Sequence, residues 1–160
     1  MDTLIIYATK HGCAKKCADL LADGLAPDVT VLNIKDKAAR NPEFDRFQNV
    51  IIGGSIHAGQ LQKSVKGFIR DHASVLKQKK LGLYLCHMEE GDSARKQFEE
   101  NFPEDLRAHA SAEGLFGGAF DFEKMNVLEK AIVKKVSGMD KSVSRIDDEA
   151  VRTFIARFNG

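Results

Sequence analysis

The sequence contains no tryptophan, three prolines and three cysteines. It also lacks a long hydrophobic run, because no window reaches the roughly 18 apolar residues that a membrane span needs. An odd and small number of cysteines argues against a disulfide framework and suits a reducing compartment. Cys13 and Cys17 lie one helical turn apart, but without clustered histidines or further nearby cysteines they form a poor metal set. We therefore expect no metal site.

An excess of charge of one sign is also missing. Lysine and arginine number 24 against 23 acidic residues, for a net charge of +1, so no overall basic field favours nucleic-acid binding. The first residues, MDTLIIYATK, do not place a basic segment before a long apolar one. These features favour a cytoplasmic protein with at most peripheral membrane contact. The 160 residues, 43% of them hydrophobic, are expected to form one domain over 1–160.

Apolar runs of strand length alternate with segments of helical periodicity, which predicts an α/β protein with a parallel sheet. The expected strands are 3–8, 29–34, 49–56, 80–87 and 112–122. The expected helices are 14–25, 61–76, 92–102, 123–137 and 147–158, and residues 35–48 hold at most a short helix. The first helix is predicted to bury Cys17, Leu20, Leu21 and Leu25 on one face, and Asp92 is a plausible N-cap of the third helix.

Three polar loops, each containing a glycine, follow the first, third and fourth expected strands. They are TKHGCA (9–14), SIHAGQ (55–60) and HMEEGD (87–92). Ligands of parallel sheets bind outside the carboxyl ends of the strands. In the first loop Thr9 supplies a hydroxyl, Gly12 permits a tight turn, and main-chain amides point out of the first turn of a helix. This pattern suits a phosphate monoester, although threonine and glycine also serve at such turns merely as caps.

Two common nucleotide motifs are absent. No G-x-x-x-x-G-K-[ST] segment is present, so a nucleoside triphosphatase would lack its lysine and its magnesium-binding hydroxyl. No G-x-G-x-x-G segment follows the first strand, which weakens the case for dinucleotide binding.

Several segments together resemble the flavodoxin family, and in particular its branch of menaquinone-dependent protoporphyrinogen dehydrogenases. They are LIIYATKHGCAKKCADLLADGL, NVIIGGSIHAGQLQKSVKGFIRDHASVL and GLYLCH, and FGGAFDFEKMNVLEKAIVKKVSG resembles the C-terminal part of the same branch. The resemblance implies a flavodoxin-like three-layer sandwich with a five-stranded parallel sheet in the order 2-1-3-4-5. It also implies flavin mononucleotide (FMN) as the cofactor.

The resemblance implies which residues bind FMN. The phosphate would lie at Thr9, Lys10, His11, Gly12, Cys13 and Ala14. The ring would lie between Ser55, Ile56, His57, Ala58 and Gly59 on one side and His87, Met88, Glu89, Gly91 and Asp92 on the other.

The resemblance leaves three functions open. The first is a flavoprotein that carries electrons between partners, either a redox partner protein or a quinone. The second is an FMN-dependent oxidoreductase of the menaquinone-dependent protoporphyrinogen dehydrogenase type, with a porphyrinogen as substrate. The third is a binding module without a cofactor. No residue is assigned a catalytic role.

The sequence departs from the family pattern at three places. Ala14 stands where such phosphate loops commonly have a hydroxyl residue, and both tyrosines, Tyr7 and Tyr84, lie inside expected strands. This leaves His57, His87 and Met88 as neighbours for a flavin ring. The segment CHMEEGDSARKQF enters a helix directly, without the long loop that this branch can carry, so the porphyrin reaction ranks second.

Some residues have two interpretations. Cys13 is either a reactive thiol at a helix N-terminus or a small turn residue, and His57 is either a proton donor near the ring or an exposed loop residue. Glu89 and Glu90 either disfavour an anionic reduced ring or are simply solvated. Cys17, Cys86 and His72 are expected to be structural. A basic run at Lys124, Lys130, Lys134, Lys135 and Lys141 suits a membrane surface, an acidic partner or an ordinary outer helix face.

Overall fold

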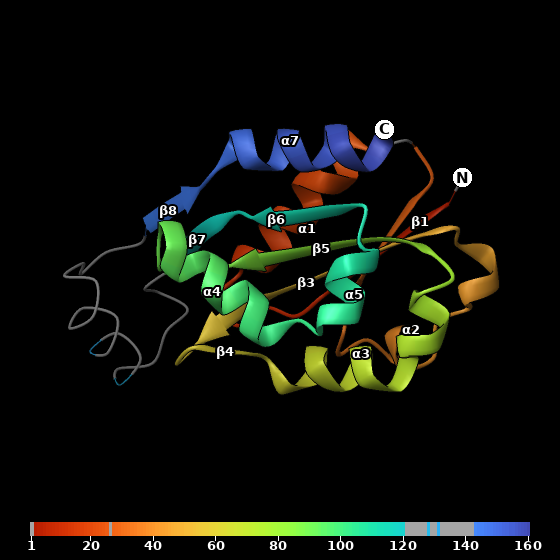
Figure 1. Cartoon of the computed structure of the whole chain (residues 1–160), viewed down its shortest axis with the longest axis horizontal. Helices are drawn as coiled ribbons and strands as arrows, with labels where there is room; N and C mark the ends of the chain where they lie inside the picture. The colour runs from red at the N-terminus through yellow and green to blue at the C-terminus, as the bar shows by residue number, and fades with distance from the viewer. Residues whose placement is uncertain (1, 26, 121–127, 129–130, 132–142) are drawn as a thin grey trace.

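A parallel sheet forms the centre of the protein (Figure 1). The computed structural model describes residues 2–25, 27–120, 128, 131 and 143–160, and the side chains of 119, 120, 143 and 144 are not described. The strands are β1 (Thr3–Tyr7), β2 (Val29–Asn33), β3 (Asn49–His57), β5 (Lys80–Cys86) and β6 (Ala112–Leu115). Their order is β2-β1-β3-β5-β6, which is the flavodoxin-like order predicted for five consecutive strands. A short strand, β4 (Gln60–Leu61), pairs antiparallel with the end of β3.

Helices cover both faces of the sheet and make three layers (Figure 1). One face is covered by α1 (Cys13–Gly24) and α7 (Asp148–Asn159). The other carries α3 (Lys63–Leu76) and α4 (Gly91–Asn101), together with the shorter α2 (Lys37–Arg40), the 3-10 turn η1 (Phe44–Arg46) and α5 (Glu104–His109). Because strand side chains alternate between faces, Ile5 and Ile51 pack toward α1 and α7, while Leu4 and Val50 pack toward the other helices.

The last predicted strand divides into two. Residues 112–122 were expected to form one strand, but β6 ends at Leu115 and β7 (Gly117–Phe120) leaves the sheet to pair antiparallel with β8 (Val143–Ile146). The turn occurs at Gly117, whose φ of +77° belongs to the left-handed region. A side chain at Gly117 would collide with the carbonyl oxygen of Arg145. The prediction failed because glycines occur on both sides of the boundary, at Gly114 and Gly118, so the sequence gives no signal that marks Gly117 as the turn.

Other predictions differ in detail. Leu20 is 38% exposed, so its predicted burial on α1 is wrong. Helix α4 begins at Gly91 with Glu90 as its N-cap, so Asp92 lies in the first turn and is not the cap. Helix α5 was not predicted. The helix expected at 123–137 and the basic run from Lys124 to Lys141 fall almost entirely outside the described residues and stay predictions.

The structural role predicted for His72 is confirmed, because its ring packs against the rings of Phe68 and Phe44 with centroid distances of 4.5 and 5.2 Å. In the described part of the chain, no helix has both the length and the apolar character needed to cross a bilayer.

Candidate functional site

The loop after β1 turns sharply into α1 at the carboxyl edge of the sheet. Gly12 adopts a left-handed φ of +94°, and its amide donates a 2.9 Å hydrogen bond to the hydroxyl oxygen of Thr9. Helix α1 then begins at Cys13, so the amides of its first turn lie at the mouth of this loop. The Thr9 oxygen accepts the Gly12 bond and still has its own proton to donate. The loop therefore presents one hydroxyl donor and a helix N-terminus at the same edge.

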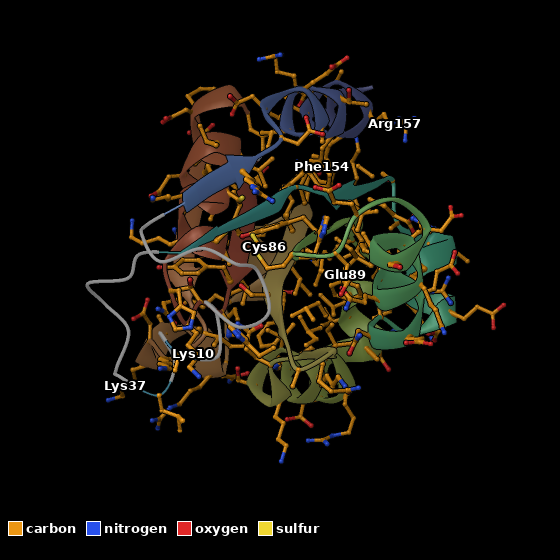
Figure 2. All side chains as sticks on the ribbon, turned by 90° about the vertical axis from the view of Figure 1, so that its left-hand side faces the viewer. Lys10, Lys37, Cys86, Glu89, Phe154 and Arg157 are labelled. Carbon is orange, nitrogen blue, oxygen red and sulfur yellow. The ribbon has the colours of Figure 1, made fainter. Side chains whose placement is uncertain are left out.

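The first loop carries no negative charge. Residues 8–14, ATKHGCA, contain no carboxylate, while Lys10 is exposed and His11 is half-buried. Figure 2, which looks onto this end of the molecule, places Lys10 and Glu89 on different sides of the strand ends, with Cys86 near the middle. The residues of this loop therefore offer hydrogen-bond donors and positive charge to an anion.

The second loop is a tight hairpin rather than an open loop. Strand β3 continues through His57, and β4 returns so that Ile56 pairs with Leu61 and His57 with Gln60. The two turn residues, Ala58 and Gly59, both have positive φ, at 51° and 75°. This is the pattern of a two-residue type I′ turn, in which alanine is a strained choice. The hairpin extends β3 beyond the neighbouring strand ends.

The first and second loops meet through two histidines. The rings of His11 and His57 lie edge to face with a centroid distance of 5.6 Å. Both are half-buried, and they come from segments that are 46 positions apart in the sequence. The pairing was not predicted, since no local pattern links the two residues.

Gln62 joins the ends of β1 and β3 just beneath these loops. Its side-chain oxygen accepts a 2.8 Å hydrogen bond from the amide of Ser55, and its nitrogen donates a 3.3 Å bond to the carbonyl of Ala8. Sequence reasoning missed this residue because it stands at the start of an amphipathic helix, where glutamine is unremarkable.

Asn101 fixes the hairpin from the other side. Its carboxamide oxygen accepts a 3.0 Å bond from the amide of Leu61, and its nitrogen donates to the carbonyls of Gly59 and Gln97 at 3.2 and 2.8 Å. Asn101 is the last residue of α4 and is 6% exposed. The sequence offered one signal that could have found it, a polar residue beside the apolar Phe98 and Phe102.

The third loop is shaped by His87. The amide of Gly117 donates a 3.2 Å bond to Nε2, so Nδ1 carries the proton and donates a 2.6 Å bond to the carbonyl of Glu89. His87 is buried, whereas Met88 beside it is 42% exposed. Both imidazole nitrogens therefore hold the backbone of the loop, and Met88 is the side chain that the loop offers to an apolar ligand.

The remaining predicted residues divide by exposure. Cys13, Ala14 and Ser55 are buried, Ile56 and Gly59 are half-buried, and Ala58, Glu89, Gly91 and Asp92 are exposed. Gly91 has a positive φ of 57° where the loop enters α4. The exposed acids of the third loop contrast with the acid-free first loop.

The floor of the first loop is a buried tyrosine. The Tyr84 hydroxyl donates a 2.8 Å hydrogen bond to the carbonyl of Ala14, and its ring stacks on Phe116 at a centroid distance of 5.2 Å. Burial raises the pKa of this phenol well above its usual range, so Tyr84 stays neutral. The ring also fills the space beside Gly53, where a side chain would collide with it.

The structure thus brings the three predicted loops to one edge, where the first contains no carboxylate and the third contains exposed acids. The first has the donors that a phosphate group needs, and the second and third supply half-buried His57 and exposed Met88. This donor set fits a ligand that carries a phosphate group. Two shallow surface depressions lie elsewhere, one of about 460 Å3 beside α1 and β8 and one of about 330 Å3 between β6 and α7.

Known proteins share sequence with most of this chain. A family model described as a flavodoxin domain matches residues 4–147. The protoporphyrinogen IX dehydrogenase (quinone) of Escherichia coli is 20% identical over 163 residues, which cover 96% of this chain and 88% of that protein.

Solved structures show the same fold. Flavodoxin 2 from Bacillus cereus superimposes with a TM-score of 0.60 at 18% identity, covering 99% of this chain and 98% of that one. The flavodiiron core Flv1 of Synechocystis superimposes with a TM-score of 0.55 at 17% identity over 74% of this chain. The chain spans only 30% of the length of Flv1.

Proposed function

The chain belongs to the flavodoxin domain family, and on that premise we propose that it binds FMN and carries electrons between redox partners. The observation that carries the proposal is the first loop, where the Thr9 hydroxyl and the left-handed Gly12 stand at the N-terminus of α1 without any carboxylate. A phosphate dianion is the ligand that these donors suit best. The loop also follows β1, which lies between the parallel strands β2 and β3, where the strand order reverses. Ligands of such sheets bind at this point.

The protein would position FMN and set the charge around it, while the flavin ring itself supplies the one- and two-electron chemistry. Thr9 and the first-turn amides of α1 would bind the phosphate. His57 and Met88 would lie beside the ring, and no tryptophan is available to stack on it. The exposed Glu89 and Asp92 would disfavour negative charge on the reduced ring and so lower its reduction potential.

The test is a titration of apo-protein with FMN, followed by quenching of flavin fluorescence, with riboflavin as the ligand that lacks phosphate. We expect FMN to bind about 100-fold more tightly than riboflavin, because two charge-assisted hydrogen bonds contribute roughly 1.5 kcal/mol each. Thr9→Val should weaken FMN binding and leave riboflavin binding unchanged. Thr30→Val, at an exposed position of β2, is the matched control.

Two results would contradict the proposal. One is equal affinity for FMN and riboflavin, which would show that the first loop does not bind the phosphate. The other is no binding of either flavin, which would favour the remaining interpretation, a flavodoxin-like binding module without a cofactor.

A second candidate is an oxidoreductase of the protoporphyrinogen IX dehydrogenase type. It is supported by the 20% identity to the Escherichia coli enzyme, which extends over most of both chains. Turnover of protoporphyrinogen IX by the FMN-loaded protein with a menaquinone analogue would separate the two candidates, since an electron carrier alone should show none.

A further inference from the structure

Three thiols converge beneath the first loop. Cys13 begins α1, Cys17 lies one turn later, and Cys86 ends β5. Their sulfur atoms all lie within 4.8 Å of one another, and the Cys17 and Cys86 sulfurs are 3.6 Å apart. The side chains are buried, with exposures of 5%, 0% and 2%. The sequence showed only the Cys13 and Cys17 pair, and the fold adds the third thiol from 69 positions away.

The spacing suits a single bound ion. For sulfur bonds of about 2.3 Å, neighbouring sulfurs lie about 3.8 Å apart around a tetrahedral ion and about 4.0 Å apart around a trigonal one. The 3.6 Å separation of Cys17 and Cys86 and the 4.8 Å upper limit on the others are compatible with these values. Changes of no more than about 1 Å in the separations would bring all three sulfurs within bonding distance of one ion.

The surroundings select the kind of ion. The thiols belong to a core cluster with Leu21, Tyr84 and Phe116, and the carbonyl oxygen of Gly117 lies 4.0 Å from the Cys13 sulfur. Hard cations need several oxygen ligands, whereas sulfur donors favour soft ions.

The charge of the three thiolates limits which soft ions the cluster can bind. Three thiolates carry three negative charges, so a monovalent ion would leave two of them uncompensated in the core, which is costly. A divalent ion leaves one negative charge uncompensated, and the N-terminus of α1 at Cys13 stabilises that charge. A trivalent ion leaves no charge uncompensated.

We propose that Cys13, Cys17 and Cys86 form a trithiolate site for a soft thiophilic ion, either a divalent ion of the zinc and cadmium type or trivalent arsenic. Binding of the divalent ion forms three metal–sulfur bonds and releases three thiol protons to solvent. Arsenous acid exchanges its three hydroxyl groups for three sulfurs and releases three water molecules. No electron is transferred in either case, and the site does not depend on a bound flavin.

The experiment titrates the reduced full-length protein with Cd²⁺ under anaerobic conditions, followed by the ultraviolet sulfur-to-metal charge-transfer band. We expect saturation at one equivalent. Each of Cys13→Ala, Cys17→Ala and Cys86→Ala should weaken Cd²⁺ binding by at least about tenfold, equal to about 1.4 kcal/mol. All cysteines of the chain lie in the cluster, so no other thiol contributes to the band.

A second titration uses arsenite and mass spectrometry. A bound adduct should add one arsenic atom and remove three hydrogen atoms, which requires three thiols on one ion. Binding of Cd²⁺ alone assigns the divalent ion, and binding of arsenite assigns the trivalent one. Circular dichroism identifies any alanine variant that fails to fold. A serine substitution at the same cysteine, such as Cys86→Ser, then replaces that variant.

The control is Asp19→Asn, which removes an exposed carboxylate from α1 and should leave the affinity unchanged. Three results would overturn the proposal: Cd²⁺ binding that survives the cysteine substitutions, binding of neither ion, or a Cys17–Cys86 disulfide in the freshly purified protein in place of an ion site.

Discussion

At the scale of single residues, Tyr84 connects the central sheet to the candidate phosphate loop. Its hydroxyl donates to the Ala14 carbonyl in the first turn of α1, and its ring rests on Phe116. Ala14 has no side-chain hydroxyl, so the position contributes its backbone alone. Tyr84 holds that backbone from below, which fixes the direction in which the amides of the first turn point.

We expect Tyr84→Phe to lower the free energy of unfolding by about 1 kcal/mol, because it removes one buried hydrogen bond and leaves the packing intact. Urea unfolding measures the change, and Tyr7→Phe, on the same side of the sheet, is the control. A Tyr84→Phe variant as stable as the wild type would mean that the bond to Ala14 contributes nothing.

Residue roles that depend on local pattern could be predicted, and those that depend on distant contacts could not. Gly12 was predicted to permit a tight turn between a strand and a helix, and its left-handed φ agrees with that. Cys17 and Cys86 were predicted to be core residues because they lie in apolar segments, and both are buried. Nothing in the sequence places Cys86 against Cys17, or Gln62 against both Ala8 and Ser55. Those contacts follow from strand order, which brings separate segments together.

At the scale of elements, the β3–β4 hairpin depends on α4 for its position. Ala58 occupies a left-handed conformation that alanine tolerates poorly, so the turn is not stabilised by its own sequence. Asn101 supplies the missing stability by bonding the amide of Leu61 and the carbonyl of Gly59. The candidate ring-binding loop is therefore held by a helix end rather than by its turn residues.

We expect Asn101→Ala to destabilise the protein by about 2–3 kcal/mol, since it leaves the buried Leu61 amide without its acceptor and removes two further bonds. Hydrogen exchange of the amides from His57 to Leu61 should accelerate more than exchange in β1. Asn159→Ala, at an exposed helix end, should change stability by less than about 0.5 kcal/mol. Unchanged exchange in the hairpin would show that α4 does not hold it.

Hydrophobic periodicity predicted the positions of helices and strands better than it predicted how they connect. The first four predicted strands and the long helices α1, α3, α4 and α7 lie within about two residues of their predicted bounds, as expected for such boundaries. The break between β6 and β7 was missed, because nothing in the local sequence distinguishes Gly117 from the other glycines of its segment. Its special role follows from the carbonyl of Arg145, which lies where a side chain would be. Turn chemistry of this kind depends on a tertiary neighbour.

At the scale of the whole molecule, α7 lies close to the sheet at a glycine. A side chain at Gly82 in β5 would lie 2.7 Å from the ring of Phe154 and 3.2 Å from that of Phe158, both in α7. The absence of a side chain at Gly82 lets α7 lie close to the sheet. By contrast, a side chain at Gly67 in α3 would meet only the flexible end of Arg70, at 3.5 Å.

These two glycines should respond to alanine in opposite directions. Gly82→Ala should destabilise the protein by about 1–3 kcal/mol through overpacking. Gly67→Ala should stabilise it by about 0.5–1 kcal/mol, because glycine is a poor residue for a helix interior. Urea midpoints measured side by side test both, and a harmless Gly82→Ala would contradict the close contact of α7 with β5.

The strand order also bears on how the chain emerges from a ribosome. β1, β2 and β3 can pair once the first 57 residues are available, and β5 and β6 then add in turn to one growing edge. On the other face α1 can pack early, but the part that α7 covers stays open longer, because that helix comprises residues 148–159. Until α7 emerges, Gly82 and Phe116, which lie against Phe154, remain open to other chains. A nascent chain is therefore most prone to aggregate through this face, and a chaperone would act there.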